Sequence, residues 1–163
     1  DGRCQTLVKG LGTWFIDGAH TKESIEAASG WFTQQVGNSK NKKILLFNQQ
    51  SRDANALLSN LYSKTYPHIQ FDGVIFTTNV TWTSGTYSSD LVSMNTSKEQ
   101  VDALEVQKSL AEKWVALDGQ RSKIHVTSSI EAAYALIKQM EEPVDVFVTG
   151  SLHLVGGLSL IHI

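Results

Sequence analysis

The sequence predicts an α/β protein with a mostly parallel sheet of six strands, one antiparallel edge strand and helices on both faces. Short apolar runs alternate along the chain with longer segments whose apolar residues recur at helical spacing. Parallel strands need a crossover, usually a helix, so this alternation favours a doubly wound parallel sheet. Glycines between the first two apolar runs allow a tight hairpin, which supplies the antiparallel edge.

The hairpin is expected from residues 3–8 and 13–16. They flank the turn Lys9-Gly10-Leu11-Gly12, whose glycines can take positive φ angles. A helix is expected next, over 22–36, because Ile25, Ala28 and Phe32 fall on one face and Glu23 lies in the first turn.

The alternation continues to the end of the chain. Apolar runs predict strands buried on both faces at residues 42–47, 71–76, 123–126 and 144–148. Helices are expected over 53–66, from a cap at Ser97 to Asp118, and over 129–140. The polar tract 77–97 is expected to be a loop, either functional or disordered.

Composition limits the possible functions. The 163 residues fit a single domain, and a net charge of −2 argues against a polyanion-binding role. The lone Cys4 excludes an internal disulfide and leaves no zinc spacing, which favours a reducing compartment; we expect a cytoplasmic protein, with a mitochondrial form as an alternative. The chain opens on a strand without methionine, so we expect a piece of a longer protein.

Polar residues follow every predicted parallel strand. In an open sheet of this kind, ligands bind beyond the carboxyl ends of the strands. The residues directly after each strand, here called the strand exits, are Asp17-Gly18, Asn48-Gln49, Thr77-Thr78-Asn79, Thr127-Ser128-Ser129 and Thr149-Gly150-Ser151. Such small polar groups suit a pocket that hydrogen-bonds its ligand, although polar loops follow buried strands in all folds of this class.

Two of these strand exits lead directly into a helix and combine several kinds of polar side chain; each is called a corner below. Asp17-Gly18-Ala19-His20-Thr21 places a carboxylate, an imidazole and a hydroxyl at a helix start, where a plain cap is the alternative. The segment 149–157 repeats glycine, hydroxyl and histidine. A metal pair would need further ligands, and Gly150-Ser151-Leu152 lacks the spacing of a nucleophile elbow. His68, His125 and His162 suit structural or solvated positions.

These motifs resemble a known family. Gly2-Arg3, the corner 17–21 and Thr149-Gly150-Ser151-Leu152-His153-Leu154-Val155-Gly156-Gly157 are similar to the C-terminal domain of the folylpolyglutamate synthases, in the Mur ligase superfamily. The resemblance covers essentially the whole chain. Thr21 followed by Ser24 resembles the eukaryotic members, whereas bacterial members and Mur ligases usually carry asparagine in place of Thr21.

The resemblance implies that residues 1–163 form the C-terminal, Rossmann-like domain of a longer two-domain ATP-dependent tetrahydrofolate:L-glutamate γ-ligase. ATP would phosphorylate the γ-carboxylate of a reduced folate, and L-glutamate would attack the acyl phosphate. The resemblance places the phosphate loop and the Mg²⁺ ligands in the N-terminal ATPase domain, and this chain has no Gly-Lys-Ser/Thr loop of its own. The fragment alone is therefore expected to be inactive, and the full protein to be a monomer that binds neither nucleic acid nor membrane.

The resemblance also implies roles for individual residues. Arg3 and Asp17 match nucleotide-binding positions, and His20 matches a catalytic one. His20, Thr21, Ser151 and His153 match residues around the incoming glutamate, and no metal ligand is implied in this chain. Two alternatives stay open: a dihydrofolate synthase or Mur-type ligase domain, and a non-catalytic Rossmann-like binding module.

Overall fold

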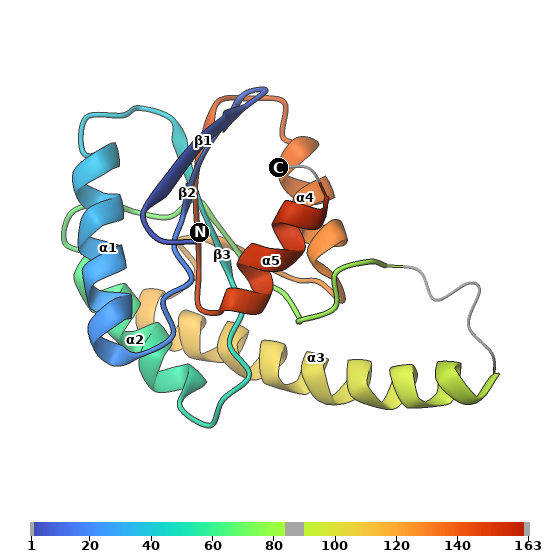
Figure 1. The fold of residues 1–163 in the computed structure, drawn as a ribbon. Coiled ribbons are helices and arrows are strands. Elements are labelled where there is room, and N and C mark those ends of the chain that lie inside the picture. The colour runs from blue at the N-terminus through green and yellow to red at the C-terminus, as the bar shows by residue number, and fades with distance from the viewer. Residues whose placement is uncertain (1, 84–89, 162–163) are drawn as a thin grey trace.

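A computed structural model describes residues 2–83 and 90–161 and shows one six-stranded sheet flanked by helices (Figure 1). The strands are β1 (Gln5–Lys9), β2 (Gly12–Ile16), β3 (Lys42–Phe47), β4 (Gly73–Phe76), β5 (Lys123–Val126) and β6 (Val144–Thr149). The helices are α1 (Lys22–Val36), α2 (Ala54–Thr65), α3 (Asp90–Asp118), α4 (Ile130–Lys138) and α5 (Leu152–Leu160). The strand order is β1-β2-β6-β3-β4-β5, with β1 antiparallel to β2 and all other pairs parallel. The predicted fold class is confirmed.

The β1–β2 hairpin turns at Gly10 and Leu11, between the paired residues Lys9 and Gly12. Gly10 has φ +60°, the sign that a two-residue hairpin turn needs at its first central position. The glycines of the sequence thus fix the antiparallel edge where it was expected.

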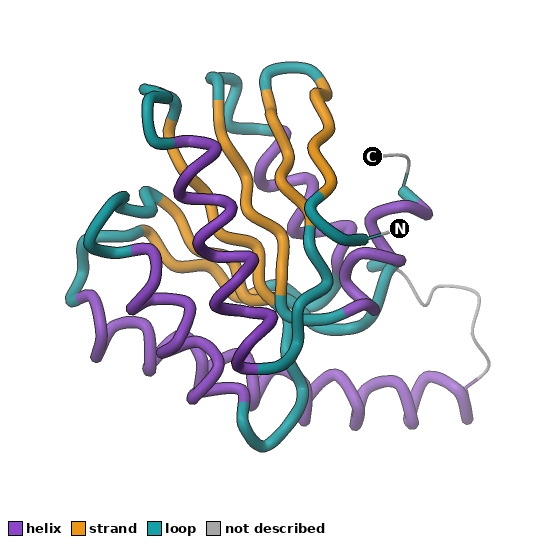
Figure 2. The backbone as a smooth tube through the Cα atoms, turned by 60° about the vertical axis from the view of Figure 1, so that its left-hand side comes forward, coloured by secondary structure: helices purple, strands orange, loops and turns teal. Residues whose placement is uncertain are grey.

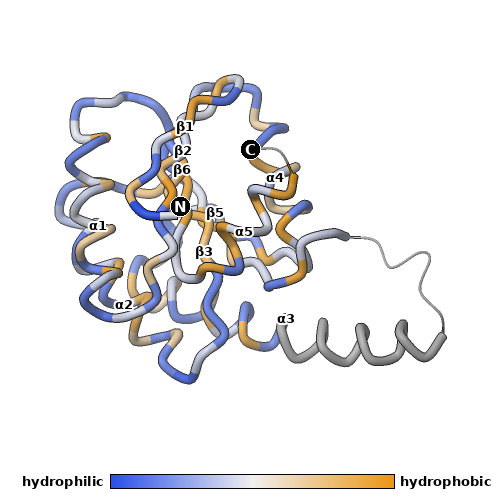
Figure 3. Tube along the Cα trace, viewed as in Figure 1, coloured by the Kyte–Doolittle hydropathy of each residue, from blue (hydrophilic) through white to orange (hydrophobic). Residues whose placement is uncertain are grey.

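Helices cover both faces of the sheet. Residues of α1, α2 and α3 pack on one face in a core cluster with Phe47 and Phe147, whereas α4 and α5 pack on the other face with Val146 and Val148. Neighbouring residues of β6 therefore serve opposite layers, as alternating side chains in a strand must. Strands β3, β4 and β6 are buried between these two helix layers; Figure 3 colours the chain by hydropathy, and Figure 2 shows α1 alongside the sheet. This explains why β3, β4 and β6 read as continuous apolar runs.

The sheet changes its winding direction at β6. Helix α1 leads from β2 to β3 and leaves a gap between them, which β6 fills after α4 has crossed the opposite face. Helices α1 and α5, which follow the neighbouring strands β2 and β6, therefore leave on opposite faces. A crevice forms at such a switch point, at the carboxyl ends of the strands.

The predicted bounds differ from the observed ones by one or two residues at several elements, and by more at the start of α3. Helix α3 begins at Asp90 and not after Ser97, so the end of the expected loop is helical. The segment 90–100 contains neither glycine nor proline, and nothing in it stops the helix from extending. Residues 84–89 of the tract lie outside the described residues. Within the described part of the chain, no helix combines the length and apolarity needed to cross a membrane.

Candidate functional site at the carboxyl ends of the strands

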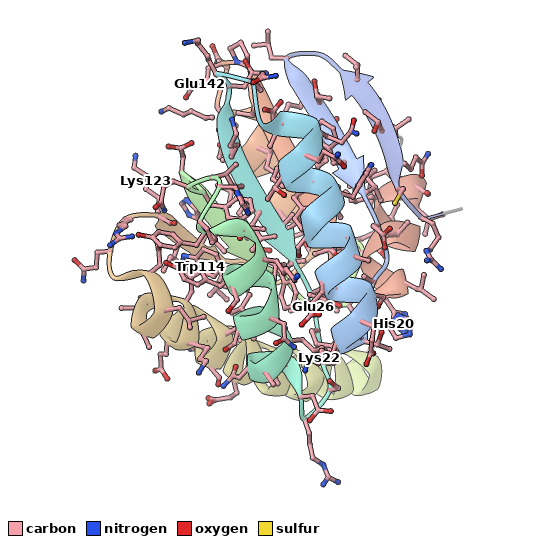
Figure 4. All side chains as sticks on the ribbon, turned by 90° about the vertical axis from the view of Figure 1, so that its left-hand side faces the viewer. His20, Lys22, Glu26, Trp114, Lys123 and Glu142 are labelled. Atoms are coloured by element: carbon pink, nitrogen blue, oxygen red, sulfur yellow. The ribbon has the colours of Figure 1, made fainter. Side chains whose placement is uncertain are left out.

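A cavity of about 310 Å³ lies at the exits of β2, β3, β4 and β6. Its lining residues are His20, Asn48, Gln49, Gln50, Asn79, Gly150, Ser151, Leu152 and His153. Three residues implied by the resemblance, His20, Ser151 and His153, therefore meet around one pocket. Figure 4 shows His20 at this end of the sheet, and Lys123 and Glu142 at the other.

The corner between β6 and α5 is built by Gly150 and Ser151. Gly150 has φ +111°, and a Cβ there would collide with the Asn48 carbonyl, so only glycine fits. Its backbone N–H donates to the Ala19 carbonyl at 3.0 Å, which ties this corner to the β2 corner. Ser151 caps α5: its Oγ accepts from the Leu154 N–H at 3.1 Å and donates to Asn48 Oδ1 at 2.6 Å.

Two amides form the floor of the pocket at the exit of β3. Asn48 is fully buried, and its Nδ2 donates to the Thr77 carbonyl at 2.7 Å. Gln49 donates to the Gly150 carbonyl at 2.8 Å and accepts from the Ser51 N–H at 2.9 Å. Sequence reasoning named these residues only as a polar strand exit. The run of three amides directly after a buried strand was the available signal.

The corner between β2 and α1 begins the helix with a capping box. Thr21 Oγ1 accepts from the Ser24 N–H at 3.2 Å, and the Thr21 N–H donates to Ser24 Oγ at 3.0 Å. The exposed imidazole of His20 lies next to it, with Nδ1 at 3.1 Å from the Gly18 carbonyl. When the proton is on Nδ1, this contact is a hydrogen bond and Nε2 is an acceptor for a ligand. Thr21 itself is outside the pocket lining.

Asp17 and Arg3 are not brought into the pocket. The buried carboxylate of Asp17 accepts from the Cys4 N–H at 3.0 Å and from Cys4 Sγ at 3.5 Å, whereas Arg3 is exposed. The Gly18 N–H also donates to the Gly2 carbonyl at 2.7 Å. In this structure Asp17 therefore fastens the segment before β1 to the end of β2. Partial burial, followed by the hydrogen bond and charge of Asp17, raises the pKa of the Cys4 thiol.

A second cavity, of about 330 Å³, lies at the opposite end of the sheet, between the hairpin and the end of α4. Trp14, Tyr134 and Ile137 line it with apolar surface. The first cavity is the stronger candidate, because imidazoles, amides and a hydroxyl converge there at the switch point of the sheet. Among the described residues, no three His, Cys, Asp or Glu side chains gather as a metal site requires.

Fold and pocket together define a Rossmann-like α/β domain with a polar pocket at the topological switch point. The family model described as "Dihydrofolate synthetase, C-terminal domain" matches residues 3–162. The chain therefore belongs to the dihydrofolate synthetase C-terminal domain family.

Named relatives and solved structures agree with this family. The chain is 64% identical over 162 residues to folylpolyglutamate synthase of Saccharomyces cerevisiae strain S288c, covering 99% of this chain and 30% of the relative. It thus spans about a third of the length of the relatives it matches. Folylpolyglutamate synthase of Mycobacterium tuberculosis, complexed with ADP and AMPPCP, matches at a TM-score of 0.60 and 17% identity, covering 98% of this chain and 31% of that chain. A Yersinia pestis bifunctional folylpolyglutamate synthase/dihydrofolate synthase matches at a TM-score of 0.62 and 18% identity, covering 99% of this chain and 31% of that chain. At these identities, the two structures show a shared fold.

Proposed function

We propose that this chain is the C-terminal domain of an ATP-dependent ligase that joins L-glutamate to the γ-carboxylate of a reduced folate. Family membership and the name of the 64% identical yeast relative support the reaction class. The observation that carries the proposal is the meeting of His20, His153 and the Ser151-capped start of α5 around one pocket.

The pocket suits an amino acid with two carboxylates. A helix N-terminus and imidazole groups both favour nearby negative charge, and the start of α5 with His20 and His153 supplies both. Amide side chains at the floor add neutral donors and acceptors. We propose that L-glutamate binds here with its amine directed out of the pocket, toward the acyl phosphate.

The reaction has two steps. The γ-carboxylate oxygen of the folate attacks the γ-phosphorus of ATP, and ADP leaves. The glutamate amine then attacks the acyl carbon, phosphate leaves with the C–O bond pair, and the amine loses its proton. We propose that His20, with Nε2 as acceptor, takes this proton or orients the amine. Water must be excluded until the amine arrives, and closure of a second domain over the pocket would do this.

The nucleotide phosphates and Mg²⁺ are proposed to bind mainly to an N-terminal domain of the full protein. This chain has no Gly-Lys-Ser/Thr loop, and its described residues form no cluster of three metal-ligand side chains. When bound, Mg²⁺ neutralises charge on the phosphates. Arg3 and Asp17 are proposed to reach the nucleotide; both hydrogen bonds from Cys4 use Oδ2 of Asp17, which leaves Oδ1 for a ribose contact.

The test is His20→Ala in the full-length enzyme, assayed by ADP release with tetrahydrofolate and L-glutamate. Turnover should fall roughly a hundredfold or more, the size of effect typical for a lost general base. The fold should stay intact, because the side chain is exposed and contacts the Gly18 carbonyl without filling the core. His68→Ala, in the exposed turn after Pro67, is the matched control and should leave turnover unchanged. Equal kinetics for His20→Ala and wild type would remove His20 from the mechanism.

A dihydrofolate synthase is the second candidate, because the matching family model carries that name. The two activities differ in the acid that is activated. Parallel assays of the full-length enzyme with dihydropteroate and with tetrahydrofolate separate them. We expect tetrahydrofolate to be the substrate, in line with the name of the yeast relative.

A further inference from the structure

We propose that Asn48 is a positioning residue that holds the glutamate side of the pocket in its binding geometry. The proposal rests on the proposed function for its kinetic part, and on contacts of this structure for its mechanical part. Asn48 follows β3, which lies between β6 and β4, so its side chain can reach both neighbouring strand exits.

The side chain of Asn48 uses both ends of its amide. Nδ2 donates to the Thr77 carbonyl at 2.7 Å, after β4, and Oδ1 accepts from Ser151 Oγ at 2.6 Å, after β6. The residue is 0% exposed, so both hydrogen bonds are buried, and a buried polar group that loses its partner costs free energy. A carboxylate could accept from Ser151, but it could not donate to Thr77. The position therefore requires an amide.

The contact with Ser151 links Asn48 to the ligand side of the pocket. Ser151 Oγ also accepts from the Leu154 N–H at 3.1 Å, so one hydroxyl connects the Asn48 amide to the first turn of α5. That turn carries His153, which lines the pocket. Through Thr77, Asn48 also fixes the segment that leads to Asn79 on the opposite wall. Loss of the amide should loosen two walls of the pocket together.

Asn48→Ala in the full-length enzyme should raise the KM for L-glutamate roughly tenfold, the order expected when one or two buried hydrogen bonds that preorganise a site are lost. The KM for ATP should stay within about twofold, because the proposed nucleotide contacts, Arg3 and Asp17, lie outside this pocket. Hydrogen exchange should show lower protection at the Leu154 amide.

Ser151→Ala should reproduce the rise in the KM for L-glutamate. Ser151→Thr, which keeps the hydroxyl and the cap, should have the wild-type KM. The matched control is Asn41→Ala, at the other end of β3, where Nδ2 donates to Asp145 Oδ1 at 3.2 Å. It should leave both KM values unchanged.

Two results would overturn the proposal. One is unchanged exchange at Leu154 in Asn48→Ala; the other is a lower kcat with both KM values unchanged, as a smaller folded fraction would give. If Asn48→Ala does not fold, the Ser151 pair decides: equal glutamate KM values for Ser151→Ala and Ser151→Thr would reject it. Absence of glutamate-dependent ADP release in wild type would reject the proposed function instead. The hydrogen-exchange experiment would still test whether Asn48 holds the start of α5.

Discussion

Gly150 shows how a single backbone conformation sets the geometry of the pocket. Its φ of +111° and the nearby Asn48 carbonyl leave no room for a side chain. Gly150→Ala should therefore lower the free energy of unfolding by about 3 kcal/mol or more, through backbone strain and a steric clash together. Equilibrium urea unfolding measures the change.

Gly119 is the matched control for this substitution. It also has a positive φ, +71°, but a Cβ there would meet nothing within 4 Å. Gly119→Ala should cost only about 1 kcal/mol, from the backbone conformation alone. Equal costs at the two glycines would show that the contact with Asn48 relaxes easily and does not constrain the corner.

Cys4 reports on the electrostatics around Asp17. Partial burial and the neighbouring Asp17 raise the pKa of the thiol, whereas Arg3 lowers it. Asp17→Asn should lower the thiol pKa and speed alkylation by iodoacetamide at pH 8 severalfold, because the thiolate is the nucleophile. Arg3→Gln should slow it. Since Cys4 is the only cysteine, the rates can be measured by mass spectrometry of the intact protein. Changes of the same sign in both variants would contradict this account.

At the scale of elements, residue patterns along the chain predicted the positions of most helices and strands, because these depend mainly on interactions between residues close in sequence. The helix over 22–36 and the strands at 42–47 and 123–126 have the predicted bounds, because the helix has a regular apolar face and a cap at Thr21, and the strands are short apolar runs. The start of α3 was missed, because a serine at position 97 looks like a cap whether or not the helix continues through it. The strand order could not be predicted from the sequence, because the insertion of β6 between β2 and β3 depends on packing between segments that are distant along the chain.

A hydrogen bond between α2 and α3 should make the free energy of unfolding depend on pH in the alkaline range. The Tyr62 hydroxyl donates to Asp118 Oδ1 at 2.9 Å, and burial followed by this carboxylate raises the pKa of Tyr62 from 10.0 to about 12. The folded state thus holds the proton more tightly than the unfolded state. The resulting stabilisation is complete below pH 10 and is lost as the pH rises from about 10 to 12.

Tyr62→Phe tests this pH dependence. The variant should lose about 1 kcal/mol at neutral pH, for one hydrogen bond, and should lose less additional stability than wild type between pH 10 and 12. Urea unfolding at a series of pH values measures both effects. Parallel stability curves for the two proteins would show that Tyr62 does not carry the alkaline loss.

At the scale of the whole molecule, the site could be predicted only in part. His20, Ser151 and His153 came from sequence motifs, and the sheet brings all three to one pocket. The roles of Asn48 and Gln49 depend on which strands lie beside β3, and the order of strands was unknown from the sequence. A motif thus identified the corners of the pocket, whereas its floor became visible only in three dimensions.

The pocket opens to solvent at the strand exits, and this leads to a prediction for the isolated chain. An acyl phosphate formed there would meet water before the amine, and the sequence has no Gly-Lys-Ser/Thr loop to hold ATP. The purified 163-residue chain should therefore release no ADP in response to tetrahydrofolate and L-glutamate, whereas the full-length protein should release it. A circular dichroism spectrum with helix and strand signals establishes that the tested chain is folded. Adding the remaining part of the protein as a separate chain should restore some activity, because the two parts would share one active site. Folate- and glutamate-dependent ADP release by the 163-residue chain alone would show that its own pocket completes the reaction.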